Sequence, residues 1–351
     1  MLTHTSTPTP AVVNGAPGHG ATRRKPNPVA KLVGMAFGLG VILVLLLMVF
    51  IMPSLKSGAH DLPLGIAGAP AVVADFEQTL GAAVPGAFDP QRFDSAEGLE
   101  AAIRDREVAG GFVLADSGIH AMVASAGSTA ISGTITATAN ALGQATGAEV
   151  TVEDIVPLPA ADPTGIGIGG LAFPLVFGGI VPAVAFLKVF PRSRAWKLAG
   201  ILAFATVGGL AVAAILRFAF GSIESFWPVA ASIALGIAAL AIPLAGLQEA
   251  FGGKGFTIGA MCMMFLGNPF AGISTTAAWL PAGLGTFGQM LPPGAAGTLV
   301  RSAAYFNGAG GLTAALTLAV WVIAGLVLHA VGRRRSGARA LAVSAAGAVD
   351  H

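Results

Sequence analysis

The chain has 351 residues, of which 54% are hydrophobic and only 10% are charged, and its mean hydropathy is +0.78. An ordinary globular domain carries about 25% charged residues. The composition therefore excludes a chain that covers itself with polar surface, and it indicates an integral membrane protein. The formal net charge of +2 gives no basis for a nucleic-acid partner. A single cysteine, Cys262, excludes an intrachain disulfide and a cysteine metal cluster.

Residues 1–30 are rich in Pro, Thr and Gly without an apolar period, so we expect a disordered cytoplasmic tail. The charge-free run from Leu32 to Met52 is long enough to cross a bilayer core about 30 Å thick. It predicts a transmembrane helix over residues 31–53. A cleaved signal peptide is the alternative, because a basic cluster precedes the run and Gly58-Ala59 resembles a weak cleavage site. The length of the run favours a retained helix.

Five more apolar segments follow an insert of residues 54–165 and form a membrane domain of residues 166–333. They predict helices over residues of about 168–188, 197–217, 227–248, 256–280 and 310–332. The many Gly and Pro of residues 281–308 predict an outer re-entrant segment before the last helix. The fold class is therefore an α-helical polytopic membrane protein with about six transmembrane helices, ending in a cytoplasmic tail of residues 334–351.

The distribution of charge predicts the orientation. If both ends are cytoplasmic, 13 of the 19 Lys and Arg residues lie in short segments on the inside, as the positive-inside rule requires. They are Arg23, Arg24, Lys25, Lys31, Lys188, Arg192, Arg194, Lys197, Lys254, Arg333, Arg334, Arg335 and Arg339. The insert carries 14 acidic residues against four basic ones. We therefore expect a multi-pass protein of the bacterial cytoplasmic membrane with an acidic extracytoplasmic domain between its first two helices.

The insert alternates between strand-like and helix-like patterns. A helix is expected to begin at Asp94 or Ser95, with Glu97 near its start, and another at Ser128. The resulting order, βαβαββαβ, predicts one compact α/β domain.

No signature of catalysis or nucleotide binding occurs in the sequence. The nearest approach to a phosphate-binding loop, Gly252-Gly253-Lys254-Gly255, lacks the hydroxyl residue and the preceding strand. The six histidines are scattered, with no spacing typical of a metal site. We therefore expect no catalytic, cofactor-binding or metal-binding residues and no cofactor in this chain. It is not predicted to be an enzyme, and any ATP hydrolysis belongs to a partner.

A few polar residues in the membrane domain are candidates for special roles. Asn268-Pro269 predicts a helix break within the span of about 256–280, either as a simple packing kink or with a role in transport. Arg301 and Tyr305 predict an outer interfacial anchor. The loop with Lys188, Arg192, Arg194 and Lys197 is a candidate contact for a partner, and a plain positive-inside loop is its alternative. No charged residue lies at the centre of a span, which argues against an ion-coupled carrier.

One helix, a large α/β insert and five helices with a Pro/Gly-rich segment before the last resemble the membrane subunits of type-2 ABC exporters, including the phage-infection-protein-like branch. The stretch from Ser95 to Leu114 and the segment from Leu280 to Arg301 are locally similar to that family. The resemblance covers about residues 30–335. It implies a homodimer or heterodimer of membrane subunits in the lipid bilayer, driven by a cytoplasmic ABC ATPase. The amphipathic helix that commonly precedes the first span in this family has no counterpart before Lys31.

The sequence therefore predicts a permease-like subunit that moves an unidentified amphipathic or envelope-associated molecule across the membrane. The alternative is a membrane-anchored envelope or receptor-like protein, whose outer domain binds a partner without transport. An associated ATPase would distinguish the two.

Overall fold

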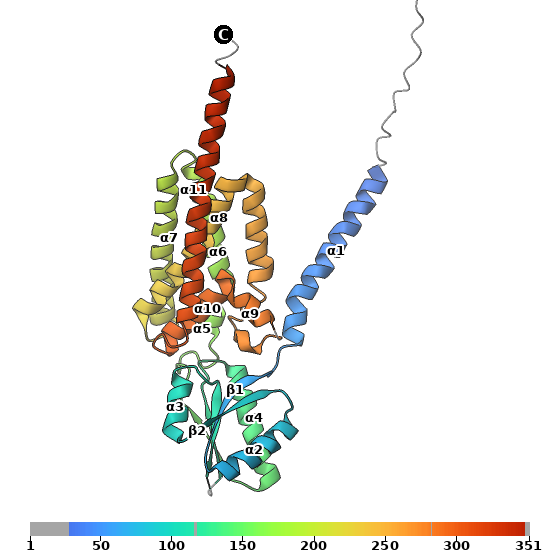
Figure 1. Ribbon diagram of the computed structural model, residues 1–351, viewed down its shortest axis with the longest axis vertical. Helices are drawn as coiled ribbons and strands as arrows, with labels where there is room; N and C mark the ends of the chain where they lie inside the picture. Colours follow the sequence, from blue (N-terminus) through green and yellow to red (C-terminus); the bar gives the residue numbers. More distant parts are fainter. Residues whose placement is uncertain (1–27, 116–117, 282, 348–351) are drawn as a thin grey trace, which may run out of the picture. The chain divides into compact units, whose positions relative to one another are not determined.

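The computed structural model describes residues 28–115, 118–281 and 283–347, with the backbone alone from residue 333 onward (Figure 1). Within these residues, five helices are long and apolar enough to cross a membrane. This confirms the prediction of a multi-pass membrane protein. They cover Pro28–Leu55, Ile166–Val189, Arg194–Ala219, Phe226–Gly267 and Leu312–Gly332. Most of the predicted N-terminal tail, residues 1–27, lies outside the described residues.

The chain forms two compact units, one ending at Leu45 and the other beginning at Leu46. The first unit contains most of α1 (Pro28–Leu55), the helix predicted over residues 31–53. Of the residues of α1, only Pro53 is buried. Its apolar side chains are exposed, which suits a helix surrounded by lipid.

The second unit begins with an α/β domain whose elements follow the predicted order βαβαββαβ. They are β1 (Leu62–Ala67), α2 (Pro70–Ala83), β2 (Phe88–Phe93), α3 (Ala96–Arg104), β3 (Gly110–Ala115), β4 (Gly118–Val123), α4 (Thr129–Thr146) and β5 (Val150–Asp154). Both predicted caps are present, because the Oγ atom of Ser95 accepts a hydrogen bond from Gly98 N and that of Ser128 accepts one from Ile131 N.

These strands make one mixed sheet in the order β2-β1-β3-β4-β5. Strand β1 is parallel to β2 and β3, β3 is antiparallel to β4, and β4 is parallel to β5. Helices α2 and α4 cover one face, where Phe112 lies fully buried. Helix α3 covers the other face through Leu99 and Ile103. The sheet is thus protected on both faces, which explains the nearly continuous burial of β1.

The rest of the second unit is a helix bundle (Figure 1). Its elements are α5 (Ile166–Gly169), α6 (Ala172–Val189), α7 (Arg194–Ala214), the π-helical turn η1 (Ile215–Ala219), α8 (Phe226–Cys262), the π-helical turn η2 (Met263–Gly267), the 3-10 turn η3 (Ala277–Trp279), α9 (Leu284–Gln289), α10 (Pro292–Tyr305) and α11 (Leu312–Gly347). Residues 236–246 of α8 are buried without interruption, so this stretch forms the centre of the bundle. Helix α11 continues into the predicted C-terminal tail.

Helix α8 turns back on itself at Gly252, whose backbone has φ 71° and ψ −162°. Its two limbs lie side by side (Figure 1), because a Cβ atom added at Gly259 would lie 2.6 Å from Cδ1 of Leu247. The sequence predicted two spans here, over about 227–248 and 256–280. The backbone at Gly252 is not helical, so the two limbs of α8 are two helices in the places that the sequence predicted, and the second limb ends at Gly267. The count of five membrane-length helices takes both limbs as one.

Helix α10 lies inside the bundle. Eleven of its 14 residues are buried, and a Cβ atom added at Gly236 of α8 would lie 2.7 Å from Cβ of Ala296. Helices α9 and α10 both fall within the segment of residues 281–308 that the sequence predicted to be re-entrant.

Candidate functional site

The charged loop between α6 and α7 lies at the end of the bundle farthest from the α/β domain, and we call this end the loop end. The four basic residues predicted here as a partner contact fall into two groups. Lys188 and Arg192 are exposed, whereas Arg194 is half-buried and Lys197 is only 5% exposed. The loop therefore exposes two of its cations and turns the other two toward the protein.

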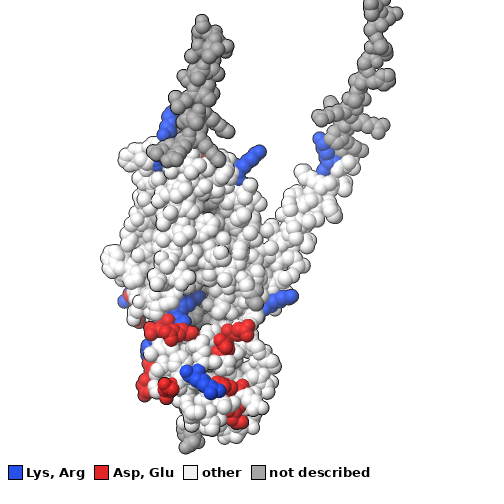
Figure 2. Space-filling view, in the orientation of Figure 1, with Lys and Arg blue, Asp and Glu red and all other residues white. Residues whose placement is uncertain are grey.

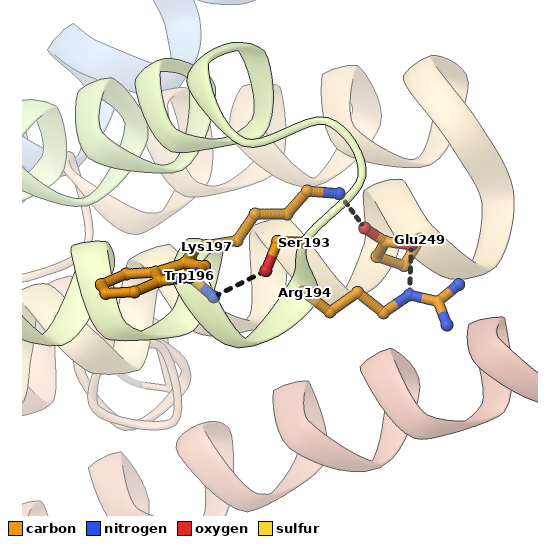
Figure 3. Close-up of polar contacts among 5 residues, drawn as sticks. All are labelled: Ser193, Arg194, Trp196, Lys197 and Glu249. Atoms are coloured by element: carbon orange, nitrogen blue, oxygen red, sulfur yellow. Dashed lines mark hydrogen bonds and ion pairs between the residues drawn. The ribbon is translucent and has the colours of Figure 1, made fainter.

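Glu249 of α8 pairs with both inward-facing cations (Figure 3). The Lys197 Nζ atom lies 2.6 Å from Glu249 Oε1, and the Arg194 Nε atom lies 3.2 Å from Glu249 Oε2. The Oγ atom of Ser193 caps α7 by accepting a hydrogen bond from Trp196 N at 3.4 Å. The first turn of α7 is thus attached to the end of the first limb of α8.

Glu249 was missed in the sequence analysis, although a signal was present. Only three acidic residues follow residue 166, namely Glu224, Glu249 and Asp350. An acid inside a membrane domain is costly without a partner, and the nearby cations were the obvious candidates.

Helix α11 also meets this cluster. A Cβ atom added at Gly332 would lie 2.6 Å from the backbone carbon of Glu249, so the two helices touch there. His329, one turn earlier, is 7% exposed, and neither ring nitrogen has a hydrogen-bond partner among the described residues. The start of α7, the end of the first limb of α8 and the middle of α11 therefore converge on Glu249.

Stacked aromatic rings stiffen the loop itself. The rings of Phe186 and Phe190 lie 6.3 Å apart, and those of Phe190 and Trp196 lie 6.1 Å apart. Trp196 and Val189 are each 63% exposed. We define Lys188, Val189, Arg192 and Trp196 as the loop-end platform, a surface that combines positive charge with apolar area.

Asn268 and Pro269 lie where the second limb of α8 stops. Helical structure ends with η2 at Gly267, and a turn occupies residues 268–270. The Oδ1 atom of Asn268 is buried and has no hydrogen-bond partner in the described part of the chain. The pair thus ends a helix, whereas the sequence predicted a break within one.

Arg301 is buried and Tyr305 is half-buried at the positions where the sequence predicted an interfacial anchor. Arg301 is 7% exposed, and its Nη2 atom donates a hydrogen bond to the carbonyl oxygen of Ile273 at 2.6 Å. The Tyr305 hydroxyl donates to the carbonyl oxygen of Ser222 at 2.9 Å. Burial raises the pKa of Tyr305 to about 12. Both side chains therefore tie α10 to neighbouring connections instead of facing the membrane surface.

The end of the bundle next to the α/β domain is a docked junction. Phe306, directly after α10, is 6% exposed and packs into the hydrophobic cluster beneath α3 of the α/β domain. The guanidinium carbon of Arg106 lies 5.0 Å from the centre of the Phe306 ring, a cation–π distance. This junction connects α10 directly to the α/β domain.

Among the described residues there is no group of three or more His, Cys, Asp or Glu side chains that could hold a metal ion. Comparison of the chain with protein-family models, with curated proteins and with solved structures finds no match. Two places in the described residues are considered below: the loop-end platform, next to the residues that pair with Glu249, and the junction.

Proposed function

We propose that this chain is the permease-like membrane subunit of an ABC-type exporter in a bacterial cytoplasmic membrane. It moves an amphipathic or envelope-associated molecule by conformational changes that a partner ATPase drives. The α/β domain lies outside the cytoplasm in this proposal, and the loop end faces the cytoplasm. The positive charge at the loop end and the acidic surface of the α/β domain support this orientation (Figure 2).

The observation that carries the proposal is the pairing of Glu249 with Arg194 and Lys197, which lie beside the loop-end platform in the chain. A subunit whose conformational change is driven by a partner needs a surface that the partner can bind. The exposed Lys188, Arg192 and Trp196 provide charge and apolar area for such a contact. Because Lys197 and Arg194 pair with Glu249, a force on this surface passes into the bundle instead of bending the loop.

The position of Glu249 determines which helices receive that force. It lies in the last turn before Gly252, at which α8 reverses, and its backbone touches Gly332 of α11. The central helix and the last helix would thus move with the platform. A shift of packed helices at a hinge of this kind is a common form of conformational change.

Co-purification from cells in a mild detergent tests the proposal. We expect the wild-type chain to retain an ATPase in constant ratio. Reversing the exposed charges with Lys188→Glu and Arg192→Glu should reduce the retained ATPase roughly tenfold, because like charges then face the partner across the contact. Matched charge reversals on the α/β domain, Arg92→Glu and Arg104→Glu, should leave the ratio unchanged.

Failure to recover an ATPase with the wild-type chain, combined with normal export in a deletion strain, would overturn the proposal. The receptor-like alternative predicts a different result, in which the chain retains a partner of its α/β domain and no ATPase. Equal losses from the platform variants and the control variants would show that the platform is not the contact.

A further inference from the structure

Two arginine side chains lie near the junction, and neither has an acidic partner among the described residues. Arg106 follows α3 of the α/β domain, and Arg301 belongs to α10. The Nη1 atom of Arg106 is buried and has no hydrogen-bond partner among the described residues. Neither arginine is ion-paired with a carboxylate in that part of the chain. Buried charges are normally paired, so this arrangement lacks a counter-charge.

The positive charge of Arg106 also acts on Arg301. Burial, followed by the positive charge of Arg106, lowers the pKa of Arg301 to about 10. Burial likewise lowers the pKa of Arg106. Both groups remain cationic near neutral pH, so the junction holds two like charges that an anion would stabilise.

The backbone of Arg106 points to a role for its side chain. Its φ angle is 61°, in the left-handed region, and it lies at the end of α3, where glycine is the favoured residue. The helix-ending hydrogen bond from Glu107 N to the carbonyl oxygen of Ala102 is 2.9 Å. An arginine at such a position is strained, and strain of this kind concentrates at functional sites.

A cavity of about 140 Å³ lies beside Arg106, and a smaller one of about 20 Å³ lies beside Arg301. Gly127 and Ser128 line both cavities and separate them. The smaller cavity is rich in hydroxyl groups, from Ser125, Ser128, Thr129, Thr164, Ser274 and Thr275. The larger one far exceeds the volume of about 10–15 Å³ that a single water requires.

The wall between the cavities is the start of α4. Ser128 is the N-cap of this 18-residue helix, whose first backbone N–H groups lie at that end. The N-terminus of a helix favours negative charge. It therefore adds to the positive potential that the two arginines create.

We propose that the junction binds an oxyanion of the phosphate class. The ligand occupies the cavity beside Arg106, with the Gly127–Ser128 turn as one wall and the charge of Arg301 behind that wall. Free phosphate and the phosphodiester of an anionic lipid headgroup share this chemistry. Because Arg106 of the α/β domain and Thr276 and Phe306 of the bundle line the same cavity, an anion bound there would connect the two parts. This inference does not depend on transport or on an ATPase.

Thermal unfolding of the full chain in a neutral detergent tests the site, with inorganic phosphate compared with chloride at equal ionic strength. Phosphate should raise the unfolding midpoint of the wild type in a saturable manner. In Arg106→Gly, glycine suits the left-handed backbone, but the cation–π contact with Phe306 is lost, so the shift caused by phosphate is measured from the variant's own phosphate-free midpoint. The same variant should weaken phosphate binding about tenfold or more, because a charged hydrogen-bond donor is lost.

Two further variants complete this test, one as a substitute for Arg106→Gly and one as a control. Arg106→Asn also tolerates the left-handed backbone and replaces the glycine variant if that one does not fold. Arg104→Gln removes an exposed arginine two positions earlier and should respond to phosphate as the wild type does.

A second arm separates the two sources of phosphate. Full-length protein is reconstituted in nanodiscs of phosphatidylglycerol or phosphatidylcholine, and the retained lipids are counted by native mass spectrometry. Retention of phosphatidylglycerol that Arg106→Gly abolishes supports a headgroup as the ligand. A saturable shift with inorganic phosphate that the same variant abolishes supports a free oxyanion. If wild type and Arg106→Gly respond identically in both arms, the proposal is overturned.

Discussion

The guanidinium group of Arg106 covers the ring of Phe306 at 5.0 Å, although the two residues belong to different parts of the fold. Phe306 follows α10, which is buried in the helix bundle, yet its ring packs into the core of the α/β domain. Movement of α10 would therefore be transmitted to the α/β domain, and movement of the domain to α10.

Replacing Phe306 with alanine should weaken this junction. The ring is 6% exposed, and loss of a buried phenylalanine side chain costs about 3–5 kcal/mol. We expect a lower thermal unfolding midpoint of the purified full chain and faster amide exchange in α3. Phe218→Ala is the matched control, because Phe218 is 77% exposed and should change the midpoint little. Equal effects of the two substitutions would contradict docking through Phe306.

Glu249→Gln should strongly destabilise the loop end. The substitution leaves the Lys197 side chain, which is 7% exposed, buried without its counter-charge. Breaking a buried pair from one side costs about 3–5 kcal/mol. Adding Lys197→Met to this variant should recover part of the loss, because the unpaired charge is then removed. The free energy of unfolding of both single variants and the double variant gives the coupling directly.

An exposed ion pair serves as the comparison for that cycle. The Arg104–Glu100 pair on α3 joins side chains that are 56% and 39% exposed, and such pairs contribute about 0–1 kcal/mol. Glu100→Gln should therefore change stability far less than Glu249→Gln. Similar losses would mean that burial does not decide the strength of the Lys197–Glu249 pair.

Gly252→Ala should disturb the reversal of α8. Its backbone, φ 71° and ψ −162°, lies in a region that is essentially restricted to glycine, and occupying it with another residue costs about 1–3 kcal/mol. Gly253→Ala provides a control one residue away, because no atom lies within 4 Å of a Cβ added there and no left-handed angle is required. Unfolding midpoints of the two variants should differ clearly. A midpoint for Gly252→Ala at or above that of Gly253→Ala would exclude a required glycine conformation.

Local patterns in the sequence predicted much of the α/β domain and the positions of the apolar helices. The caps at Ser95 and Ser128 and the order of strands and helices along the chain depend on neighbouring residues, so they could be predicted without knowledge of the fold. The end of helical structure at Gly267, after α8 and η2, could not be predicted in this way, because residues 268–280 carry no charge although they are not α-helical. Hydropathy records where a segment is apolar and not whether its backbone continues as a helix.

The contacts of the candidate sites could not be predicted from local patterns, because their partners are distant in the chain. Lys197 and Glu249 are separated by 52 positions, Arg301 and Ile273 by 28, and Tyr305 and Ser222 by 83. An arginine and a tyrosine one turn apart beside a Gly/Pro-rich segment are typical of an interfacial anchor. Only the path of α10 through the bundle brings both side chains to buried carbonyl groups.

The proposed orientation predicts a labelling pattern for introduced cysteines. Cys262 is the single, exposed cysteine, so Cys262→Ala provides a background that should not react with a maleimide. Glu107→Cys adds a thiol on the surface of the α/β domain, and Arg192→Cys adds one at the loop end. A membrane-impermeant maleimide applied to intact cells should label the first and not the second, because the loop end carries the inside-positive charge. Permeabilised cells should show labelling at both positions. Labelling of Arg192→Cys alone in intact cells would reverse the orientation and place the proposed ATPase contact on the wrong side of the membrane.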